Sequence, residues 1–167
     1  MSRTPTGEDP RQVLWAPWRM DWILSDKPGG CALCRKLDEG AELDPLIVHA
    51  GPEAIVCMNK YPYGSGHLLV YPRRHCADLL ELDATERSAL EDALHHALRA
   101  VREALNPEGV NLGMNLGEAA GAGIPGHLHW HLVPRWSGDT NFLSVVADVR
   151  SMPEHLRDTH ARIKACW

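Results

Sequence analysis

One long stretch of the chain places its apolar residues at the spacing of an α-helix. In residues 84–105 they recur at intervals of three or four positions, which keeps them on one helix face. These residues are Leu90, Leu94, Ala97, Val101 and Leu105. Asp83 and Glu86 have the spacing of a capping box, and NPEG at 106–109 contains residues that end helices. The pattern predicts a helix over residues 84–105.

Short apolar runs on both sides of this helix predict strands, because each is bounded by glycine, proline or polar residues. The runs are 46–50, 54–59, 67–72, 110–115 and 127–133. A last helix is expected over residues 153–165. The order β-β-β-α-β-β-α, with short connections, indicates an α+β domain with a mainly antiparallel sheet.

The last predicted strand carries a histidine at every second position. The sequence GHLHWHLVPRW, residues 126–136, contains His127, His129 and His131. Since successive side chains of a strand point to opposite faces, the three imidazoles are expected on one face. The intervening leucine and tryptophan residues are expected in the core on the other face.

Alternating histidines on one strand fit more than one kind of site. Three imidazoles can hold a catalytic zinc ion, or one imidazole can act as a nucleophile beside groups that bind an anion. An exposed polar face that happens to use histidine is a further interpretation. Three histidines in five residues, next to the glycine-rich loop LGEAAGAGIPG, favour a chemical role.

Composition limits the classes of function. A chain of 167 residues with 44% hydrophobic residues is expected to form one domain. Its formal net charge of -5 gives no general reason to bind nucleic acid, so an anionic ligand must be held by a local site. The chain contains no apolar run of ~18 residues that could span a membrane, and MSRTPTGEDPRQ lacks the apolar segment of a signal peptide. A cytoplasmic protein without nucleic-acid or membrane partners is therefore expected.

The cysteines suggest metal binding more than disulfide formation. Their odd number, five, fits a reduced compartment. Cys31 and Cys34 have the C-x-x-C spacing of a zinc-binding pair, but a tetrahedral site needs four ligands. A pair of reduced core cysteines is the alternative interpretation.

Several motifs together resemble the histidine triad (HIT) family of nucleotidyl hydrolases and transferases. HLHWHLV has the family's His-X-His-X-His-X-X pattern, and NKYPYGSGHLLVYPRRH at 59–75 is similar to its Asn-x-x-Pro-x-x-x-Gly-His-x-x-Val-x-Pro segment. NLG at 115–117 and PRWSGDTNF at 134–142 also match. The APWR sequence and the PRWSGDTNF tail look most like the fragile-histidine-triad branch, within which bacterial enzymes cleave diadenosine tetraphosphate by phosphorolysis or hydrolysis.

The resemblance implies a fold and an assembly. The fold would be a HIT-like five-stranded antiparallel sheet with two main helices, and two subunits would pair into a ten-stranded sheet as a homodimer. Residues 1–167 would form a single HIT domain. It would comprise an irregular Trp- and Pro-rich arm over 1–30, a HIT core over 45–145 and a C-terminal helical segment over 146–167.

The resemblance also implies roles for single histidines. His129 would attack the α-phosphorus of a nucleotide and form a nucleotidyl-imidazole intermediate, while a backbone carbonyl accepts the proton of its far ring nitrogen. His131 would bind the α-phosphate or the leaving oxygen. His67 would orient the triad from outside it.

Substrate-binding roles follow in the same way. The resemblance implies that Asn59 contacts the ribose and Asn115 the sugar-phosphate, and that amides from Gly117 to Gly123 bind phosphate oxygens. A simple turn residue is the alternative for Asn59, and a flexible hairpin for the loop. Many family members have Gln-Ser or Gln-Thr where this chain has Gly123 and Ile124. Assistance to the leaving group is therefore expected from another residue.

The family pattern also completes the predicted metal site. By resemblance, His75 and His127 would join Cys31 and Cys34 around a structural zinc ion. Such an ion would tie the amino-terminal arm to the catalytic strand.

The predicted activity is therefore nucleotidyl transfer or hydrolysis of dinucleoside polyphosphates, with phosphate or water as the acceptor. Three alternatives stay open at this point. They are a nucleoside phosphoramidate hydrolase of the same family, a zinc hydrolase with all three histidines on one metal, and a non-catalytic nucleotide-binding protein.

Overall fold

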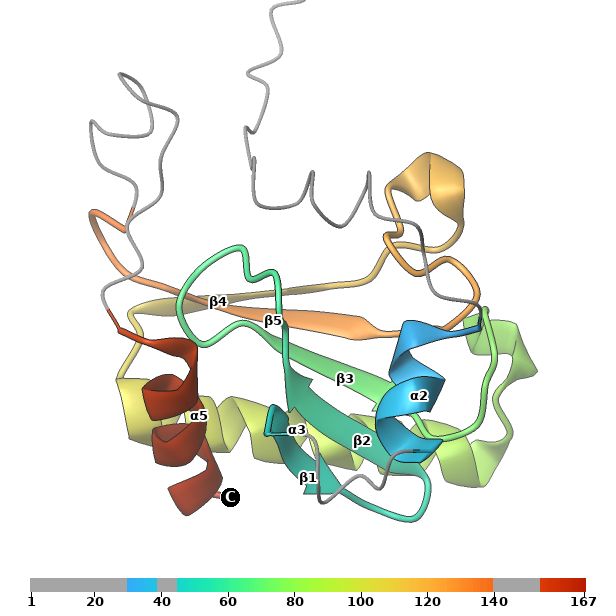
Figure 1. Cartoon of the computed structure of the whole chain (residues 1–167), viewed down its shortest axis with the longest axis horizontal. Coiled ribbons are helices and arrows are strands. Elements are labelled where there is room, and N and C mark those ends of the chain that lie inside the picture. The colour runs from blue at the N-terminus through green and yellow to red at the C-terminus, as the bar shows by residue number, and fades with distance from the viewer. Residues whose placement is uncertain (1–29, 39–44, 140–153) are drawn as a thin grey trace, which may run out of the picture.

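The computed structural model describes residues 30–38, 45–139 and 154–167, and their centre is a five-stranded sheet. The strands lie in the order β1-β2-β3-β5-β4, and every neighbouring pair is antiparallel (Figure 1). They are β1 (Ile47–Ala50), β2 (Ala54–Met58), β3 (Leu68–Pro72), β4 (Gly109–Gly113) and β5 (Trp130–Arg135). The predicted α+β class with an antiparallel sheet is confirmed.

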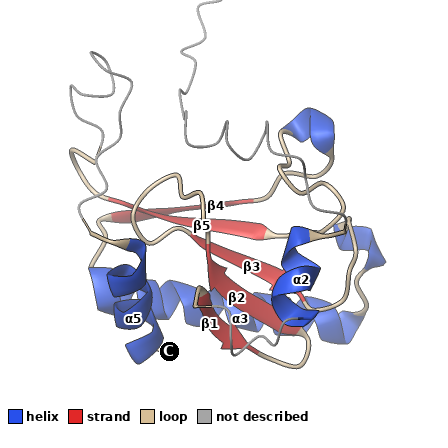
Figure 2. Ribbon diagram, in the orientation of Figure 1, coloured by secondary structure: helices blue, strands red, loops and turns tan. Residues whose placement is uncertain are grey.

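The helices cover the two faces of the sheet (Figure 2). Helix α3 (Ala84–Leu105) packs on one face, and α5 (Leu156–Ala165) packs against α3 and β1. Helix α2 (Ala32–Asp38) lies on the other face, where Leu33 is buried against strands β1 to β3. None of the helices in the described segments is long and apolar enough to cross a membrane.

The ends of α3 are set by the residues that the sequence pattern identified. The Asp83 carboxylate accepts from the Glu86 N–H at 2.9 Å, and the Asp83 N–H donates to the Glu86 carboxylate at 3.0 Å. Asn106 adopts a left-handed conformation with φ of 47°, which ends the helix. The predicted helix over 84–105 is confirmed with both of its boundaries.

Strands β2 and β3 are buried on both faces, so they separate two apolar clusters. Val56, Leu68 and Val70 point into the cluster under α3. Leu69 and Tyr71 point into the cluster under α2. This alternation makes the two central strands apolar at almost every position, as expected for strands covered on both sides.

Several predicted boundaries are wrong by a few residues. The predicted strand 127–133 begins only at Trp130, so His127 and His129 lie in the segment that leads into β5. Strand β4 ends at Gly113 because its partner there is His131, close to the start of β5. Helix α2 was not predicted at all, since seven residues are too few to show a helical period.

The remaining differences lie near the ends of the chain. Helix α5 begins at Leu156, three residues after the predicted start at 153. The predicted arm over 1–30, apart from Gly30, and residues 146–153 of the predicted C-terminal segment lie outside the described residues.

Candidate active site

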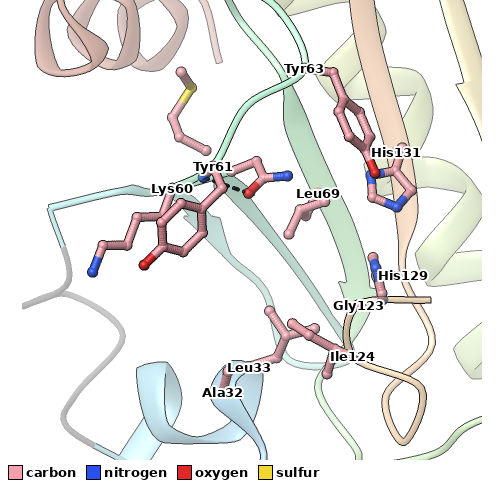
Figure 3. A pocket seen from close by; sticks show the side chains of 12 residues that line it. Ala32, Leu33, Lys60, Tyr61, Tyr63, Leu69, Gly123, Ile124, His129 and His131 are labelled. Atoms are coloured by element: carbon pink, nitrogen blue, oxygen red, sulfur yellow. Dashed lines mark hydrogen bonds between the residues drawn. The ribbon is translucent and has the colours of Figure 1, made fainter. Parts of the chain in front are cut away.

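A pocket opens on the α2 side of the sheet and brings together residues from several parts of the chain (Figure 3). His129 and His131 line it from the β5 segment, and Asn59 lines it from the turn after β2. Leu33 and Ile124 supply an apolar wall. The pocket therefore combines imidazoles with an apolar surface, a lining that suits a ligand with both an anionic and an apolar part.

His129 is held in one defined tautomer. Its Nδ1 lies 2.7 Å from the carbonyl oxygen of His127, and a carbonyl can only accept, so Nδ1 carries the hydrogen. The lone pair of the ring is therefore on Nε2. Burial lowers the pKa of His129, which favours the neutral ring. The carbonyl that sequence alone could not identify is that of His127.

His131 is linked to a second histidine outside the triad. His67, which is fully buried, places its Nε2 2.9 Å from Nδ1 of His131. Nδ1 of His67 accepts a hydrogen bond from the Tyr63 N–H at 3.0 Å, and the Asn59 amide nitrogen lies 3.3 Å from the same atom. The structure thus places His67 behind His131 and not in the pocket itself.

Four side chains of types that bind metals converge at the amino-terminal end of α2, and one of them is the first histidine of the triad. The ligating atoms of Cys31, Cys34, His75 and His127 all lie within 4.8 Å of one another. The His127 Nδ1 lies 3.3 Å from Cys31 Sγ and 3.5 Å from Cys34 Sγ, and the His75 Nδ1 lies 3.3 Å from Cys34 Sγ. A tetrahedral zinc ion separates such neighbouring ligand atoms by about 3.4 to 3.8 Å, so the group fits this metal.

The orientation of His127 supports the same conclusion. Its Nε2 lies 2.8 Å from the carbonyl oxygen of Pro72, so Nε2 carries the hydrogen and Nδ1 directs its lone pair at the cysteines. Burial lowers the pKa of His127, which favours the neutral, ligating form. Among the described residues, His129 and His131 do not belong to this group, so the structure does not assemble the three-histidine metal site of the zinc hydrolase alternative.

The glycine-rich loop is only partly at the pocket. Gly123 lines it, whereas Asn115 and Gly117 do not. The Asn115 side chain instead donates to the Gly121 carbonyl at 3.4 Å and so bridges the loop. Roles for Asn115 and Gly117 in binding a nucleotide stay predictions.

Sequence reasoning missed part of the pocket wall. Leu33 lies between the two cysteines of CALC, and Tyr61 and Tyr63 lie between Asn59 and His67. The sequence offered one signal that these residues could line a site: they lie inside motifs that were identified through other residues. Their direction toward the pocket depends on α2 and on the turn geometry, which a sequence pattern does not show.

Comparison of the sequence with known proteins gives consistent matches. The HIT domain family matches residues 41–138. The chain is 34% identical to an AP-4-A phosphorylase of Mycobacterium tuberculosis over 95% of this chain and 86% of that protein. It is 32% identical to Protein hit of Bacillus subtilis over 69% of this chain and 77% of that protein.

Solved structures share the fold. A hypothetical histidine triad nucleotide-binding protein from Sulfolobus tokodaii superposes with a TM-score of 0.67 at 26% identity, covering 81% of this chain and 91% of that one. A zinc-bound histidine triad family protein from Mycobacterium smegmatis superposes with a TM-score of 0.65 at 24% identity, covering 82% and 92%.

Proposed function

This chain belongs to the HIT domain family, and on that premise we propose that it cleaves dinucleoside polyphosphates such as diadenosine tetraphosphate through a nucleotidyl-histidine intermediate. The observation that carries the proposal is the 2.7 Å hydrogen bond from Nδ1 of His129 to the His127 carbonyl. It leaves Nε2 of a pocket-lining imidazole as the nucleophilic atom. The similarity to the mycobacterial AP-4-A phosphorylase over nearly the whole chain supports the substrate class.

The first step is attack of His129 Nε2 on the α-phosphorus. The new P–N bond forms as the P–O bond to the leaving nucleotide breaks, and the electron pair stays on the leaving oxygen. The hydrogen on Nδ1 remains donated to the His127 carbonyl, which stabilises the positive charge that develops on the ring. One difficult transfer is thereby divided into two easier ones.

In the second step, an oxygen of phosphate or water attacks the same phosphorus. The new P–O bond forms as the P–N bond breaks, which returns the electron pair to Nε2, and an attacking water releases its proton to the solvent. With diadenosine tetraphosphate, phosphate as acceptor gives ADP and ATP, and water gives AMP and ATP. His131 and the amides near Gly123 are proposed to donate to phosphoryl oxygens. Asn59, which also lines the pocket, is proposed to contact the ribose.

Cys31, Cys34, His75 and His127 would hold a structural zinc ion. Bound there, the metal would supply mechanical linkage between α2 and the segment that leads into β5, with no open position for chemistry. Because Leu33 of α2 lines the pocket, this linkage would hold the apolar wall beside the nucleophile.

The test is the product pattern from diadenosine tetraphosphate with inorganic phosphate, measured by anion-exchange chromatography for the native protein and His129→Ala. We expect products only from the native protein, ADP with ATP for a phosphorylase and AMP with ATP for a hydrolase. His95→Ala, on the exposed face of α3, is the matched histidine control and should keep native turnover. Equal turnover by His129→Ala would remove His129 as the nucleophile.

A second measurement separates a catalyst from a protein that only binds nucleotides. Acid-free quenching followed by mass spectrometry should detect a nucleotidyl adduct on the peptide that contains His129. Absence of both products and adduct would contradict the proposed substrate and favour a phosphoramidate substrate or a binding role.

A further inference from the structure

We propose that Tyr63 is a positioning residue for this reaction, which determines through His67 which ring nitrogen of His131 carries the hydrogen. The kinetic consequence rests on the proposed function. The tautomer itself is a property of the protein without substrate, so the two can be tested apart.

The first step of the argument is the hydrogen bond from the Tyr63 main chain. A main-chain N–H can only donate, so Nδ1 of His67, 3.0 Å away, must accept. The Asn59 side-chain nitrogen approaches the same atom at 3.3 Å. This amide is oriented, because its Oδ1 accepts from the Tyr61 N–H at 2.9 Å. Nδ1 of His67 therefore has no hydrogen, and the hydrogen of the neutral ring is on Nε2.

The second step extends the assignment of the hydrogen position from His67 to His131, which belongs to the triad. Nε2 of His67 lies 2.9 Å from Nδ1 of His131, and with its hydrogen it must be the donor. The reverse direction would leave His67 without a hydrogen on either nitrogen. That is an anionic ring, which a residue with 0% exposure does not sustain near neutral pH. His131 consequently accepts at Nδ1 and carries its own hydrogen on Nε2.

The third step concerns the Tyr63 ring, which packs against both imidazoles. It stacks on His67 with centroids 4.8 Å apart and an interplanar angle of 19°, and its centroid lies 5.5 Å from that of His131. One aromatic ring thus contacts both imidazoles. Tyr63 and His131 also line the pocket together, and Figure 3 shows the Tyr63 ring beside His131. It holds the plane of His67 and keeps water from competing for the hydrogen bond between the two rings.

The consequence for catalysis is a fixed donor at Nε2 of His131. A group that already points its hydrogen at a phosphoryl oxygen stabilises the developing charge without reorganising during the reaction. Gly123 has no side chain and Ile124 has an apolar one, so neither residue offers a side-chain donor to a phosphoryl oxygen. The reaction therefore depends strongly on the donor at His131.

The experiment replaces the ring while the main-chain donor stays in place. Tyr63→Leu and Tyr63→Met remove the stacking, and Tyr63→Phe keeps it as the matched control. Nitrogen-15 NMR of the imidazoles, without substrate, should show a hydrogen on Nε2 of His131 in the native protein and in Tyr63→Phe. In Tyr63→Leu and Tyr63→Met the signals of the two nitrogens should move toward each other, because the plane of His67 is no longer held against the main-chain donor, the hydrogen bond to its Nδ1 weakens and both tautomers become populated. Two apolar replacements keep the test valid if one of them fails to melt cooperatively.

Kinetics with diadenosine tetraphosphate provide the second readout. We expect kcat to fall about 10- to 100-fold in the two apolar variants with KM changed less than about threefold, and to stay near native in Tyr63→Phe. Native tautomers and native kcat in Tyr63→Leu would overturn the proposal. An equal loss in Tyr63→Phe would overturn it as well, because the phenolic hydroxyl would then be the acting group.

A double-mutant cycle tests whether Tyr63 acts through His67. Removing the ring in a His67→Ala background should cost little more than His67→Ala alone, and additive losses would contradict the proposed route. If the native protein shows no turnover with this substrate, the proposed function fails while the NMR result still decides the role of Tyr63.

Discussion

At the scale of single residues, Glu86 shows how one side chain can serve two structural purposes. Its carboxylate caps α3 by accepting from the Asp83 N–H, and it also accepts from Arg74 at 2.6 and 2.8 Å. The Glu86 side chain is only 8% exposed. The hydrogen bonds from Arg74, more than the one from Asp83, lower its pKa to about 2. The ionised form is therefore strongly favoured in the folded protein.

This pKa shift predicts a pH-dependent stability difference between the native protein and Glu86→Gln. A carboxyl group whose pKa is lower in the folded state stabilises the fold above its unfolded value of 4.5 and loses this effect as the pH falls toward about 2. Thermal melts should show a Tm deficit of the variant at pH 7 that shrinks below pH 4.5. Glu91→Gln, at an exposed position of the same helix, should melt like the native protein. A deficit that does not depend on pH would contradict the role of the charge.

The residues of the candidate site differ in how far the sequence determines them. The metal group could be predicted, because family motifs carry Cys31, Cys34, His75 and His127, and the structure brings all four together. The hydrogen-bond acceptor of His129 could not be predicted, because every residue has a carbonyl and only the backbone path selects the one of His127. The tautomer of His131 could not be predicted either, because it depends on the main-chain N–H of Tyr63 and every residue except proline has such a donor.

At the scale of elements, the turn between β2 and β3 carries the residues that position His131. The Asn59 N–H donates to the His67 carbonyl at 2.9 Å, which closes the turn. Gly66 has a φ of +74°, and a Cβ added there would collide with the side chain of Leu105 at the end of α3. This glycine therefore lets the turn lie directly against α3 and β5.

Gly66→Ala is predicted to destabilise the protein by about 1 to 3 kcal/mol, because a side chain at positive φ is strained and its Cβ would also displace the end of the Leu105 side chain. It should also lower turnover by displacing His67. Gly64→Ala is the control within the same turn, since its added Cβ would only touch Val133 at an ordinary 3.8 Å. Urea unfolding of both variants measures the difference. Similar midpoints for the two would show that the turn tolerates the change.

Helix α2 is the helix that sequence periodicity missed, and its packing on the sheet, together with a metal bound by its cysteines, would stabilise so short a helix in its position. Leu33 anchors it to the sheet, while Cys31 and Cys34 face His75 and His127. The intrinsic helix propensity of seven residues contributes little to the stability of a helix. Tertiary contacts therefore stabilise α2. By contrast, the 22 residues of α3 show their period clearly, and both ends carry capping signals.

Zinc binding is predicted to depend on Cys34. The native protein should contain about one zinc ion per chain by mass spectrometry of the metal, and Cys34→Ser should lose it together with thermal stability. Zinc at about 100 times its Kd would stabilise the native protein by about 2.7 kcal/mol. Cys166→Ser, which alters a free cysteine outside the group, should keep the metal. A native protein without zinc after purification in zinc-containing buffer would refute the site.

At the scale of the whole molecule, the sheet has one edge that the described residues leave open. Strand β4 is the last in the sheet order, whereas β1 at the other end contacts α5. Leu112 on β4 is 45% exposed, and Leu116 just beyond it is 41% exposed. An edge strand with exposed leucines is a surface on which a second chain can extend the sheet.

The homodimer with a ten-stranded sheet therefore stays a prediction, now with a defined surface. Light scattering should give twice the 18.5 kDa chain mass, and Leu112→Glu should shift the protein toward the monomer. Leu80→Glu changes a leucine that is 94% exposed and lies away from β4, so it should remain dimeric. A native monomer at micromolar concentration would exclude the predicted assembly.

The two roles of His127 affect which substitutions at this position the protein can tolerate during evolution. The His127 imidazole is one of the four candidate metal ligands, whereas the His127 carbonyl oxygen accepts the hydrogen bond from His129. A substitution replaces the imidazole, but every amino acid at this position has a carbonyl oxygen. A mutation at this position can therefore abolish metal binding and still leave the acceptor of the nucleophile in the backbone. Descendants of this chain could lose the zinc site by stepwise substitution without first losing the atom that orients His129. Selection could therefore change the proposed metal site and the proposed nucleophile separately, although both depend on residue 127.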